Sequence, residues 1–342
     1  MKADIAVMTN ATALDRRLSV APMMDWTDRH CRYLHRLISA RTLLYTEMIT
    51  AAAIAHGDAE RLLGFSDAEQ PVALQIGGSE PALLAEAVGT AIGFGYPEIN
   101  LNVGCPSDRV QNGAFGACLM READLVADCV AAMIDAAGGR AAITVKCRLG
   151  VDDQEVEQTL PDFIARVSAA GVTTFCIHAR KAWLQGLSPK ENRDIPPLDY
   201  PLARRMKAER PDLNISVNGG VTDLGAAEAF LADGFDGVMI GRAAYHDPMS
   251  ILADADRRIF GDDRPASRAE DVVRAMLPYI EARLGQGDRL NQITRHMLGL
   301  FQGRPGARRW RRILSEGAHR PGAGTALVEE ALSAIEPQAE AA

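Results

Sequence analysis

The stretch NISVNGGVTDLGAAEAFLADGFDGVMIGR, residues 214–242, holds two short β-rich apolar runs with a helix-like segment between them. The runs are Asn214-Val217 and Gly237-Ile240, and the segment is Leu224-Asp233. A Gly-containing turn follows the segment and can end a helix. Alternation of strand, helix and strand is typical of a parallel α/β fold.

The same unit recurs along the chain. Six earlier runs have the same character: Leu18-Ala21, Leu43-Thr46, Val72-Ile76, Glu98-Asn102, Ala142-Lys146 and Thr174-His178. Helix-like stretches lie between several of them, at Pro81-Ile92, Glu122-Ala137 and Thr159-Ala170. Eight such units predict a closed (β/α)8 barrel, the TIM barrel. A doubly wound sheet also alternates, but its Gly-rich fingerprint after the first strand is missing.

Strand signals stop beyond Tyr245, and helical patterns follow. We therefore expect an α/β protein with a TIM barrel over residues 14–245 and a smaller all-helical domain over residues 246–335. The helices expected in the second domain are Ser267-Leu284, Asp288-Leu300, Gly306-Leu314 and Ala326-Ala334.

The composition is that of an ordinary globular protein, with 47% hydrophobic and 24% charged residues in 342. No apolar run reaches the roughly 18 residues that span a bilayer, and residues 1–17 lack the apolar core of a signal peptide. We expect a cytoplasmic protein with no membrane partner. Six scattered cysteines form no CxxC pair, so we expect no metal.

The charge is unevenly distributed. The net charge of −8 argues against a nucleic-acid partner, yet eight arginines and one acid, Glu316, lie between Arg289 and Arg320. Arg308, Arg311 and Arg312 have the spacing of one helix face, which leaves Trp310 and Ile313 to face a core. A positive face can attract a polyanion; an arginine-rich solvated helix is the alternative.

Polar or small residues follow nearly every expected strand. Because all eight carboxyl ends of a barrel meet on one face, we expect these residues to be neighbours. They are Pro22, Met23, Met24, Glu47, Gln75, Asn102, Cys105, Lys146, His178, Asn218, Gly219, Gly220, Gly241 and Arg242.

The last two loops predict a phosphate site. Gly219, Gly220 and Gly241 allow backbone N–H groups to approach phosphate oxygens, and Arg242 adds charge. The alternative is that the glycines only make tight turns. Lys146 ends an apolar strand, where it could offset negative charge on a reduced flavin. Gln75 and His178 could bond the ring edge or phosphate, although a lone strand-end histidine is usually a satisfied core residue.

Cys105 lies in the stretch Asn-Val-Gly-Cys-Pro, residues 102–106. Gly104 and Pro106 predict a loop just past the strand, which would hold the thiol at one end of the barrel. A thiol there can act as a nucleophile or as a general acid. A small packing residue is the alternative.

Several stretches together resemble the tRNA-dihydrouridine synthases over nearly the whole chain. They are Ala21-Pro-Met-Met-Asp-Trp-Thr-Asp28, Tyr45-Thr-Glu-Met48, Gln75-Ile-Gly-Gly78, Asn100-Leu-Asn-Val-Gly-Cys-Pro-Ser107, Val145-Lys-Cys-Arg-Leu-Gly150, Ile177-His-Ala-Arg180, Asn218-Gly-Gly220 and Gly241-Arg242. The segments 180–190 and 296–307 resemble the A subfamily in particular, which implies uridines 20 and 20a of the tRNA D-loop as targets.

The resemblance implies an FMN enzyme that takes hydride from NADPH and passes it from flavin N5 to C6 of uracil, while Cys105 protonates C5. It implies FMN contacts by Pro22 to Met24, Gln75, Lys146, His178, Asn218 to Gly220, Gly241 and Arg242. It further implies that Asn102 holds the uracil and that Lys190, Arg193, Arg308 and Arg311 contact tRNA.

Two other functions compete with this interpretation. A barrel that reduces a small pyrimidine such as dihydroorotate needs the same loops, lysine and thiol, but no positive helical domain. A silent RNA-binding protein requires the loss of a reactive position, and none is lost. The sequence does not determine the oligomeric state; we expect a monomer.

Overall fold

The computed structural model describes residues 14–107 and 113–335. Eight parallel strands close into a barrel in chain order, each bonded to the next and β8 to β1. The strands are β1 (Leu18–Val20), β2 (Leu43–Thr50), β3 (Val72–Gly77), β4 (Glu98–Val103), β5 (Ala142–Cys147), β6 (Thr174–His178), β7 (Asn214–Asn218) and β8 (Gly237–Ile240). The expected (β/α)8 barrel is confirmed. The strand bounds agree closely with the expected runs except for β2, which continues past the expected end at Thr46 to Thr50, so Glu47 lies within the strand and not after it.

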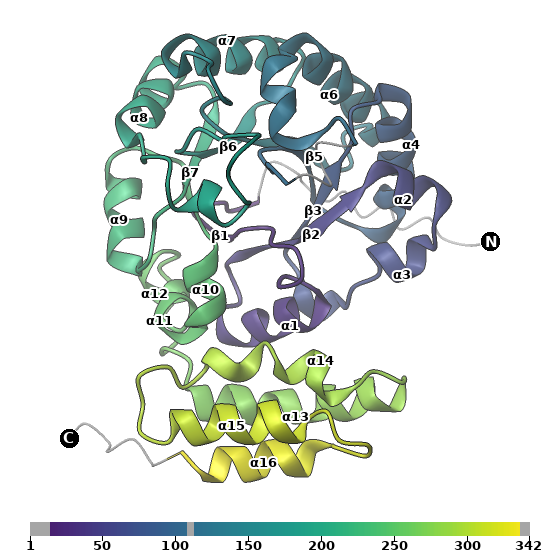
Figure 1. The fold of residues 1–342 in the computed structure, drawn as a ribbon, viewed down its shortest axis with the longest axis vertical. Helices are drawn as coiled ribbons and strands as arrows, with labels where there is room; N and C mark the ends of the chain where they lie inside the picture. The colour runs from purple at the N-terminus through teal and green to yellow at the C-terminus, as the bar shows by residue number, and fades with distance from the viewer. Residues whose placement is uncertain (1–13, 108–112, 336–342) are drawn as a thin grey trace.

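Helices form a ring outside the barrel (Figure 1). The longer ones are α1 (Arg29–Ile38), α4 (Pro81–Ala91), α6 (Ala123–Ala137), α7 (Val156–Ala169), α8 (Tyr200–Glu209) and α9 (Leu224–Ala232). Short helices follow β2 and β8: α2 (Ala51–His56), α3 (Ala59–Leu63), α10 (Arg242–His246), α11 (Pro248–Leu252) and α12 (Ala255–Arg258). The helices α4, α6 and α7 pack side by side along this ring.

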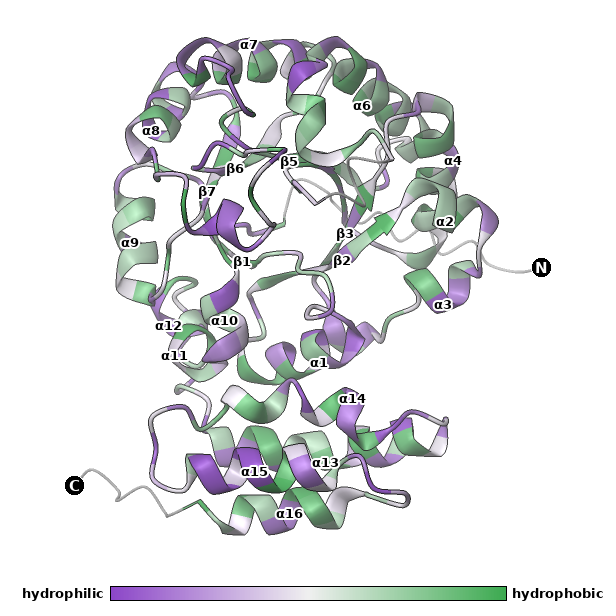
Figure 2. Ribbon diagram, viewed as in Figure 1, coloured by the Kyte–Doolittle hydropathy of each residue, from purple (hydrophilic) through white to green (hydrophobic). Residues whose placement is uncertain are grey.

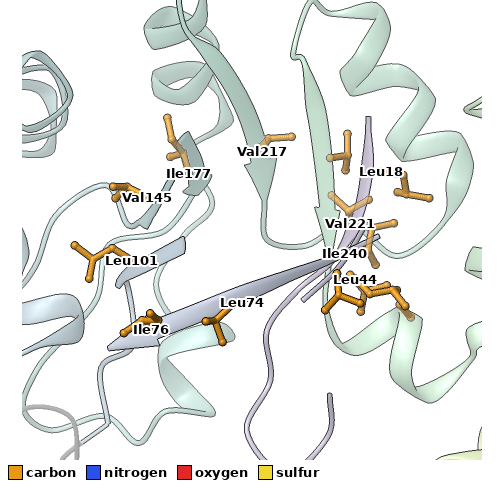
Figure 3. Close-up of a cluster of buried hydrophobic side chains, with 14 of the residues drawn as sticks. Leu18, Leu44, Leu74, Ile76, Leu101, Val145, Ile177, Val217, Val221 and Ile240 are labelled. Atoms are coloured by element: carbon orange, nitrogen blue, oxygen red, sulfur yellow. The ribbon is translucent and has the colours of Figure 1, made fainter. Parts of the chain in front are cut away.

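The main core lies between the strands and the surrounding helices. Figure 3 shows outward-facing strand residues such as Leu74, Leu101, Val145, Ile177 and Val217 in this layer. All five are fully buried. Strands covered on both faces lose contact with water, which is why the parallel sheet carries so many branched apolar residues.

The interior of the barrel is divided between apolar and polar side chains. One part is an apolar cluster of Ala21, Leu43, Tyr45, Ala73, Cys176 and Met239. The other part comes largely from β4, whose residues alternate between polar and apolar. Glu98, Asn100 and Asn102 are buried polar residues, whereas Ile99, Leu101 and Val103 belong to the outer core. Since successive side chains of a strand point to opposite faces, β4 lines the interior with polar groups from end to end.

Four helices follow the barrel and pack beneath it in Figure 1. They are α13 (Ala269–Gly285), α14 (Leu290–Thr294), α15 (Ala307–Gly317) and α16 (Thr325–Ser333). The helix α16 packs on α13 and α15, while α13 and α14 contact α1 of the barrel. The domain boundary at residues 245 and 246 stays a prediction; α10 crosses it.

One expected helix is wrong. The segment Asp288-Leu300 is not a single helix but α14 followed by the 3-10 turn Met297–Gly299. The Trp310 indole N–H donates to the Met297 carbonyl at 3.1 Å, and His296 Nε2 lies 3.1 Å from a carboxylate oxygen of Asp28. These tertiary contacts fix the backbone where a regular helix would continue.

No helix among the described residues is long and apolar enough to cross a membrane. All six cysteines are free thiols. Cys31, Cys129, Cys147 and Cys176 are buried as small core residues, and Cys105 and Cys118 are partly exposed.

Candidate active site at the barrel mouth

The barrel mouth is the face formed by the carboxyl ends of the eight strands. Cys105 lies there, just beyond β4. The Asn102 side-chain oxygen accepts the N–H groups of Gly104, at 3.0 Å, and Cys105, at 2.9 Å. The Cys105 carbonyl in turn accepts the Ala117 N–H at 2.9 Å. These bonds fix the loop on both sides of the thiol, which is partly exposed and lies 3.5 Å from Ser107 Oγ.

Gln75 and Asn102 are bonded to each other. Asn102 Nδ2 donates to Gln75 Oε1 at 2.8 Å, and Gln75 Nε2 donates to Asn100 Oδ1 at 2.8 Å. An amide nitrogen carries two N–H groups, so both residues retain donor capacity beyond these bonds. A carbonyl of a flavin or a pyrimidine could accept such a donor.

Lys146 lies one residue before the end of β5, at the same face. Its ammonium group donates to Asn218 Oδ1 at 3.0 Å, and Asn218 Nδ2 donates to the Met239 carbonyl at 2.8 Å. Burial lowers the pKa of Lys146. The hydrogen bond from Lys146 goes to a neutral amide, which holds the side chain in place without neutralising it. A negatively charged ligand could therefore pair with Lys146.

His178 lies beside Lys146 and several arginines. Burial, followed by the positive charges of Arg148 and Lys146, holds the pKa of His178 well below its ordinary value. The ring is therefore neutral near pH 7, and it can donate one hydrogen bond and accept another.

The two glycine positions after β7 have backbone angles that favour glycine. Gly219 and Gly220 have φ of 108° and 73°. A Cβ on Gly219 would lie 2.6 Å from the His178 ring, and one on Gly220 would lie 2.6 Å from the Tyr200 hydroxyl. Because neither glycine has a side chain, the backbone of the loop can lie directly against its neighbours. A phosphate-binding loop requires such exposed backbone.

The remaining expected cofactor residues also meet at this face. A Cβ placed on Gly241 would lie 3.6 Å from Met23 Sδ, so the loops after β1 and β8 touch. Pro22 is half-buried and Met24 is 52% exposed. Arg242 is held by Asp194 at 2.7 Å, which neutralises part of its charge.

The segment after β6 brings two further expected residues. Arg193 ends the 3-10 turn Glu191–Arg193, and Lys190 precedes it as an exposed side chain. Burial and the positive charge of Arg242 lower the pKa of Arg193. Arg193 is thus close enough to Arg242 for their charges to interact, and both add positive potential near the mouth.

Arg308 and Arg311 lie elsewhere, on α15 of the helical part. Figure 2 shows hydrophilic stretches along this helix. Trp310 is fully buried and Ile313 is partly buried, as the spacing predicted. Arg308 and Arg312 are exposed, and no described carboxylate forms an ion pair with either. Arg311 donates to Gln302 at 2.8 Å.

From its position in the sequence, Glu47 could orient a substrate or a neighbouring loop, or form a buried ion pair at the strand end. It accepts the Asp25 N–H at 2.5 Å, and no ion pair to it occurs within the described ranges. The structure supports loop orientation.

Sequence reasoning missed Arg148. This residue is 2% exposed, and its guanidinium donates to the carbonyls of Gly104 and Asn192, at 3.1 Å and 2.9 Å. It therefore ties the Cys105 loop to the segment after β6. Burial lowers the pKa of Arg148 to about 10. The signal was a second charge, two residues after Lys146, at the end of an apolar strand.

Among residues 14–107 and 113–335, no group of three or more His, Cys, Asp or Glu side chains could hold a metal ion. The barrel resembles solved flavoenzyme barrels in fold. Morphinone reductase superimposes with a TM-score of 0.53 at 14% identity, over 77% of this chain and 91% of that chain. An old yellow enzyme homologue from Zymomonas mobilis gives 0.51 at 13%, over 75% and 91%.

The fold and the site define a (β/α)8-barrel protein whose polar side chains and glycine loops gather at the carboxyl ends of the strands. The chain belongs to the dihydrouridine synthase family, because residues 19–336 match that family's sequence pattern. It is accordingly a flavin-dependent oxidoreductase. The tRNA-dihydrouridine(20/20a) synthase of Vibrio cholerae is 59% identical over 320 residues, 93% of this chain and 96% of the relative. That of Escherichia coli strain K12 is 59% identical over 93% and 91%.

Proposed function

We propose that the protein reduces the C5–C6 double bond of uridines 20 and 20a in the tRNA D-loop, with FMN as cofactor and NADPH as reductant. The observation that carries this proposal is the partly exposed Cys105 thiol, which Asn102 fixes at the barrel mouth of a chain that is 59% identical to synthases named for these positions.

The residues at the mouth fit FMN. The phosphate requires positive charge, which Arg242 provides. It also requires backbone N–H groups that no side chain covers, which Gly219, Gly220 and Gly241 provide. The ring requires a cation and neutral polar groups, which Lys146, Asn218, Gln75 and His178 provide. Met23 lies beside Gly241, and Pro22 and Met24 are its neighbours in the loop after β1. When bound, FMN would supply the hydride that reaches C6.

Cys105 supplies the proton. Hydride addition at C6 leaves an enolate of the pyrimidine, and protonation at C5 completes the reduction. A positioned acid is commonly worth ~10²- to 10⁴-fold in rate. Asn102 positions the thiol through the loop N–H groups and has donor capacity left for a uracil carbonyl.

The substrate uridine belongs to a folded RNA, so it has to leave its stack to reach the mouth. We expect Lys190 and Arg193 to contact RNA beside the mouth and Arg308 and Arg311 to contact its backbone. In Figure 1 the segment after β6 crosses in front of the barrel, and α15 lies in front of α13. One RNA could therefore contact both. We expect the protein to act in the cytoplasm as a monomer.

The test is mass spectrometry of nuclease-digested tRNA that lacks dihydrouridine at the start, after incubation with purified enzyme and NADPH. We expect dihydrouridine in fragments that contain positions 20 and 20a. Bound flavin without modified tRNA would instead favour the reduction of a small pyrimidine.

The Cys105→Ala variant tests the proton donor. It should retain flavin and tRNA binding but form dihydrouridine at least about 10²-fold more slowly, because only the acid is removed. Cys118→Ala is the matched control, since Cys118 is the other partly exposed thiol. Equal rates for Cys105→Ala and wild type would contradict the assignment.

A further inference from the structure

A continuous line of side-chain hydrogen bonds runs through the barrel interior from the start of β4 to the Cys105 loop. We call it the polar chain, and it consists of Glu98, Thr144, Asn100, Gln75 and Asn102. All five are buried, with at most 8% exposure. Each residue donates to the next one toward Glu98. The groups at the two ends of the polar chain both require this direction of donation.

At the start of β4, the lower end of the polar chain is the carboxylate of Glu98. Glu98 forms an ion pair with Arg16 at 2.7 Å and accepts the Tyr45 hydroxyl. Burial and the negative charge of Glu98 hold the pKa of Tyr45 well above its ordinary value, so the phenol keeps its proton and donates. The Thr144 hydroxyl also donates to Glu98, at 2.9 Å.

That single donation fixes the next bonds. A threonine hydroxyl has one hydrogen, so with that hydrogen on Glu98 its oxygen can only accept. It accepts Asn100 Nδ2 at 2.8 Å. The Asn100 oxygen must then face Gln75, whose Nε2 donates to it at 2.8 Å, and the Gln75 oxygen must face Asn102 Nδ2, again at 2.8 Å.

The upper end requires the same direction independently. The Asn102 oxygen faces two backbone N–H groups, those of Gly104 and Cys105, which can only donate. The reverse amide orientation would place N–H against N–H at the top and leave buried groups unpaired, which is costly.

We propose that Glu98, Thr144 and Asn100 are positioning residues that restrain the Asn102 amide in the orientation that its loop contacts require and, through it, the place of the Cys105 thiol. This inference rests on the proposed function for its catalytic consequence. None of the three touches Cys105; they act through Gln75 and Asn102. The geometry of the thiol is thus determined partly by a carboxylate at the opposite end of the strand.

The Thr144→Val variant tests the proposal, because it keeps the branched shape and removes the hydroxyl. Without that hydroxyl, Asn100 Nδ2 loses its acceptor, so a buried donor is left unpaired and the polar chain loses its restraint at the Glu98 end. Misplacement of a reacting group by about an ångström costs up to ~10²-fold. We expect dihydrouridine formation by the reduced enzyme to slow by about 10- to 100-fold, with KM for tRNA and the rate of flavin reduction by NADPH unchanged.

Thr144→Ser and Ser216→Ala are the matched controls. Thr144→Ser keeps the hydroxyl and should restore the wild-type rate. Ser216 lines the same small interior cavity as Thr144 but takes no part in the polar chain, so Ser216→Ala should behave as wild type. If Thr144→Val does not fold with flavin bound, Thr144→Ala removes the same hydroxyl with less bulk. A general loss of stability would affect both half-reactions, whereas mispositioning affects only tRNA reduction.

A second readout separates this inference from the proposed function. Alkylation of Cys105 by iodoacetamide, followed by peptide mass spectrometry, should be faster in Thr144→Val than in Thr144→Ser, because the loop is less restrained. If wild type forms dihydrouridine but Thr144→Val matches it in both readouts, the positioning role is wrong and the proposed function stands. If wild type forms none, the proposed function fails, and the alkylation rates alone decide the positioning role.

Discussion

At the residue scale, the site depends on groups whose backbone or burial is unusual. Gly219 combines a φ of 108° with a close approach to the His178 ring. The loop that we propose for the FMN phosphate therefore cannot accept a side chain without moving His178. Replacing Gly219 would therefore both destabilise the fold and disturb the site.

We expect Gly219→Ala to lower the free energy of unfolding by more than about 1 kcal/mol and to reduce flavin content. The control is Gly234→Ala, at a φ of 95° with no atom within 4 Å of the added Cβ. The Gly234→Ala variant should lose only the unfolding free energy that the positive φ costs an alanine, and it should keep its flavin. Urea unfolding and absorbance of the bound flavin measure the two effects. Full flavin content in Gly219→Ala would show that the loop tolerates a side chain.

At the element scale, α1 joins the barrel to the helical part through its N-cap. Asp28 accepts the N–H groups of His30 and Cys31 and also binds Arg295 at 2.5 Å and His296 at 3.1 Å. Although burial acts to raise the pKa of Asp28, contacts with His296 and the Cys31 N–H hold it well below its ordinary value. The carboxylate thus contributes stability above its ordinary pKa, and this contribution is lost as pH falls through the folded value.

Asp28→Asn should cost about 2 kcal/mol of unfolding free energy at pH 7. Asparagine still caps the helix, so the loss reports the contacts with Arg295 and His296. Asp223→Asn on α9 is the control, because Asp223 caps that helix and forms no ion pair with a described residue. Equal losses in urea unfolding of the two variants would show that capping, not the contact between the two parts, is what Asp28 contributes.

The exposed face of α15 carries the expected RNA contacts. Arg308→Gln and Arg311→Gln should each weaken tRNA binding and lower the slope of log K against log salt by roughly one, as the loss of one phosphate contact predicts. Arg257→Gln, an exposed arginine on α12 that pairs with Asp254, is the control. Filter binding across a salt series measures the slopes. Unchanged slopes would mean that α15 is only a solvated helix.

At the scale of the whole molecule, buried neutral histidines link stability to pH. Burial, together with the charges of His296 and Arg36, lowers the pKa of His35 to about 3, and burial lowers that of His30 to about 4. The unfolded chain takes up these protons as pH falls below about 6.5, whereas the folded protein does not. The unfolded state then binds more protons than the folded state, so the free energy of unfolding decreases as the pH falls.

Each of these histidines should remove about 3 kcal/mol of unfolding free energy between pH 7 and pH 4.5, at about 1.4 kcal/mol per unit. His35→Gln should therefore flatten the pH dependence, as measured by urea unfolding at several pH values. His319→Gln, at an exposed position, is the control. A slope for His35→Gln equal to that of wild type would contradict a neutral buried His35.

The sequence by itself determined that the fold is a barrel and which residues lie at the barrel mouth. Eight apolar runs with helical segments between them allow few other topologies, and parallel strands place their carboxyl ends on one face whatever the details of packing. Cys105, Lys146, His178 and the glycines could therefore be named from their positions after strands. Their assigned roles stay predictions.

Only the tertiary structure decided what holds those residues in place. The break at Met297, the tie from Arg148 to Gly104 and Asn192, and the direction of the polar chain depend on contacts between residues distant in the sequence. Local propensity carries no information about such partners. Only the pairing of β4 with β3 and β5 brought Gln75 and Thr144 within hydrogen-bond distance of Asn100, because neighbouring strands supply them.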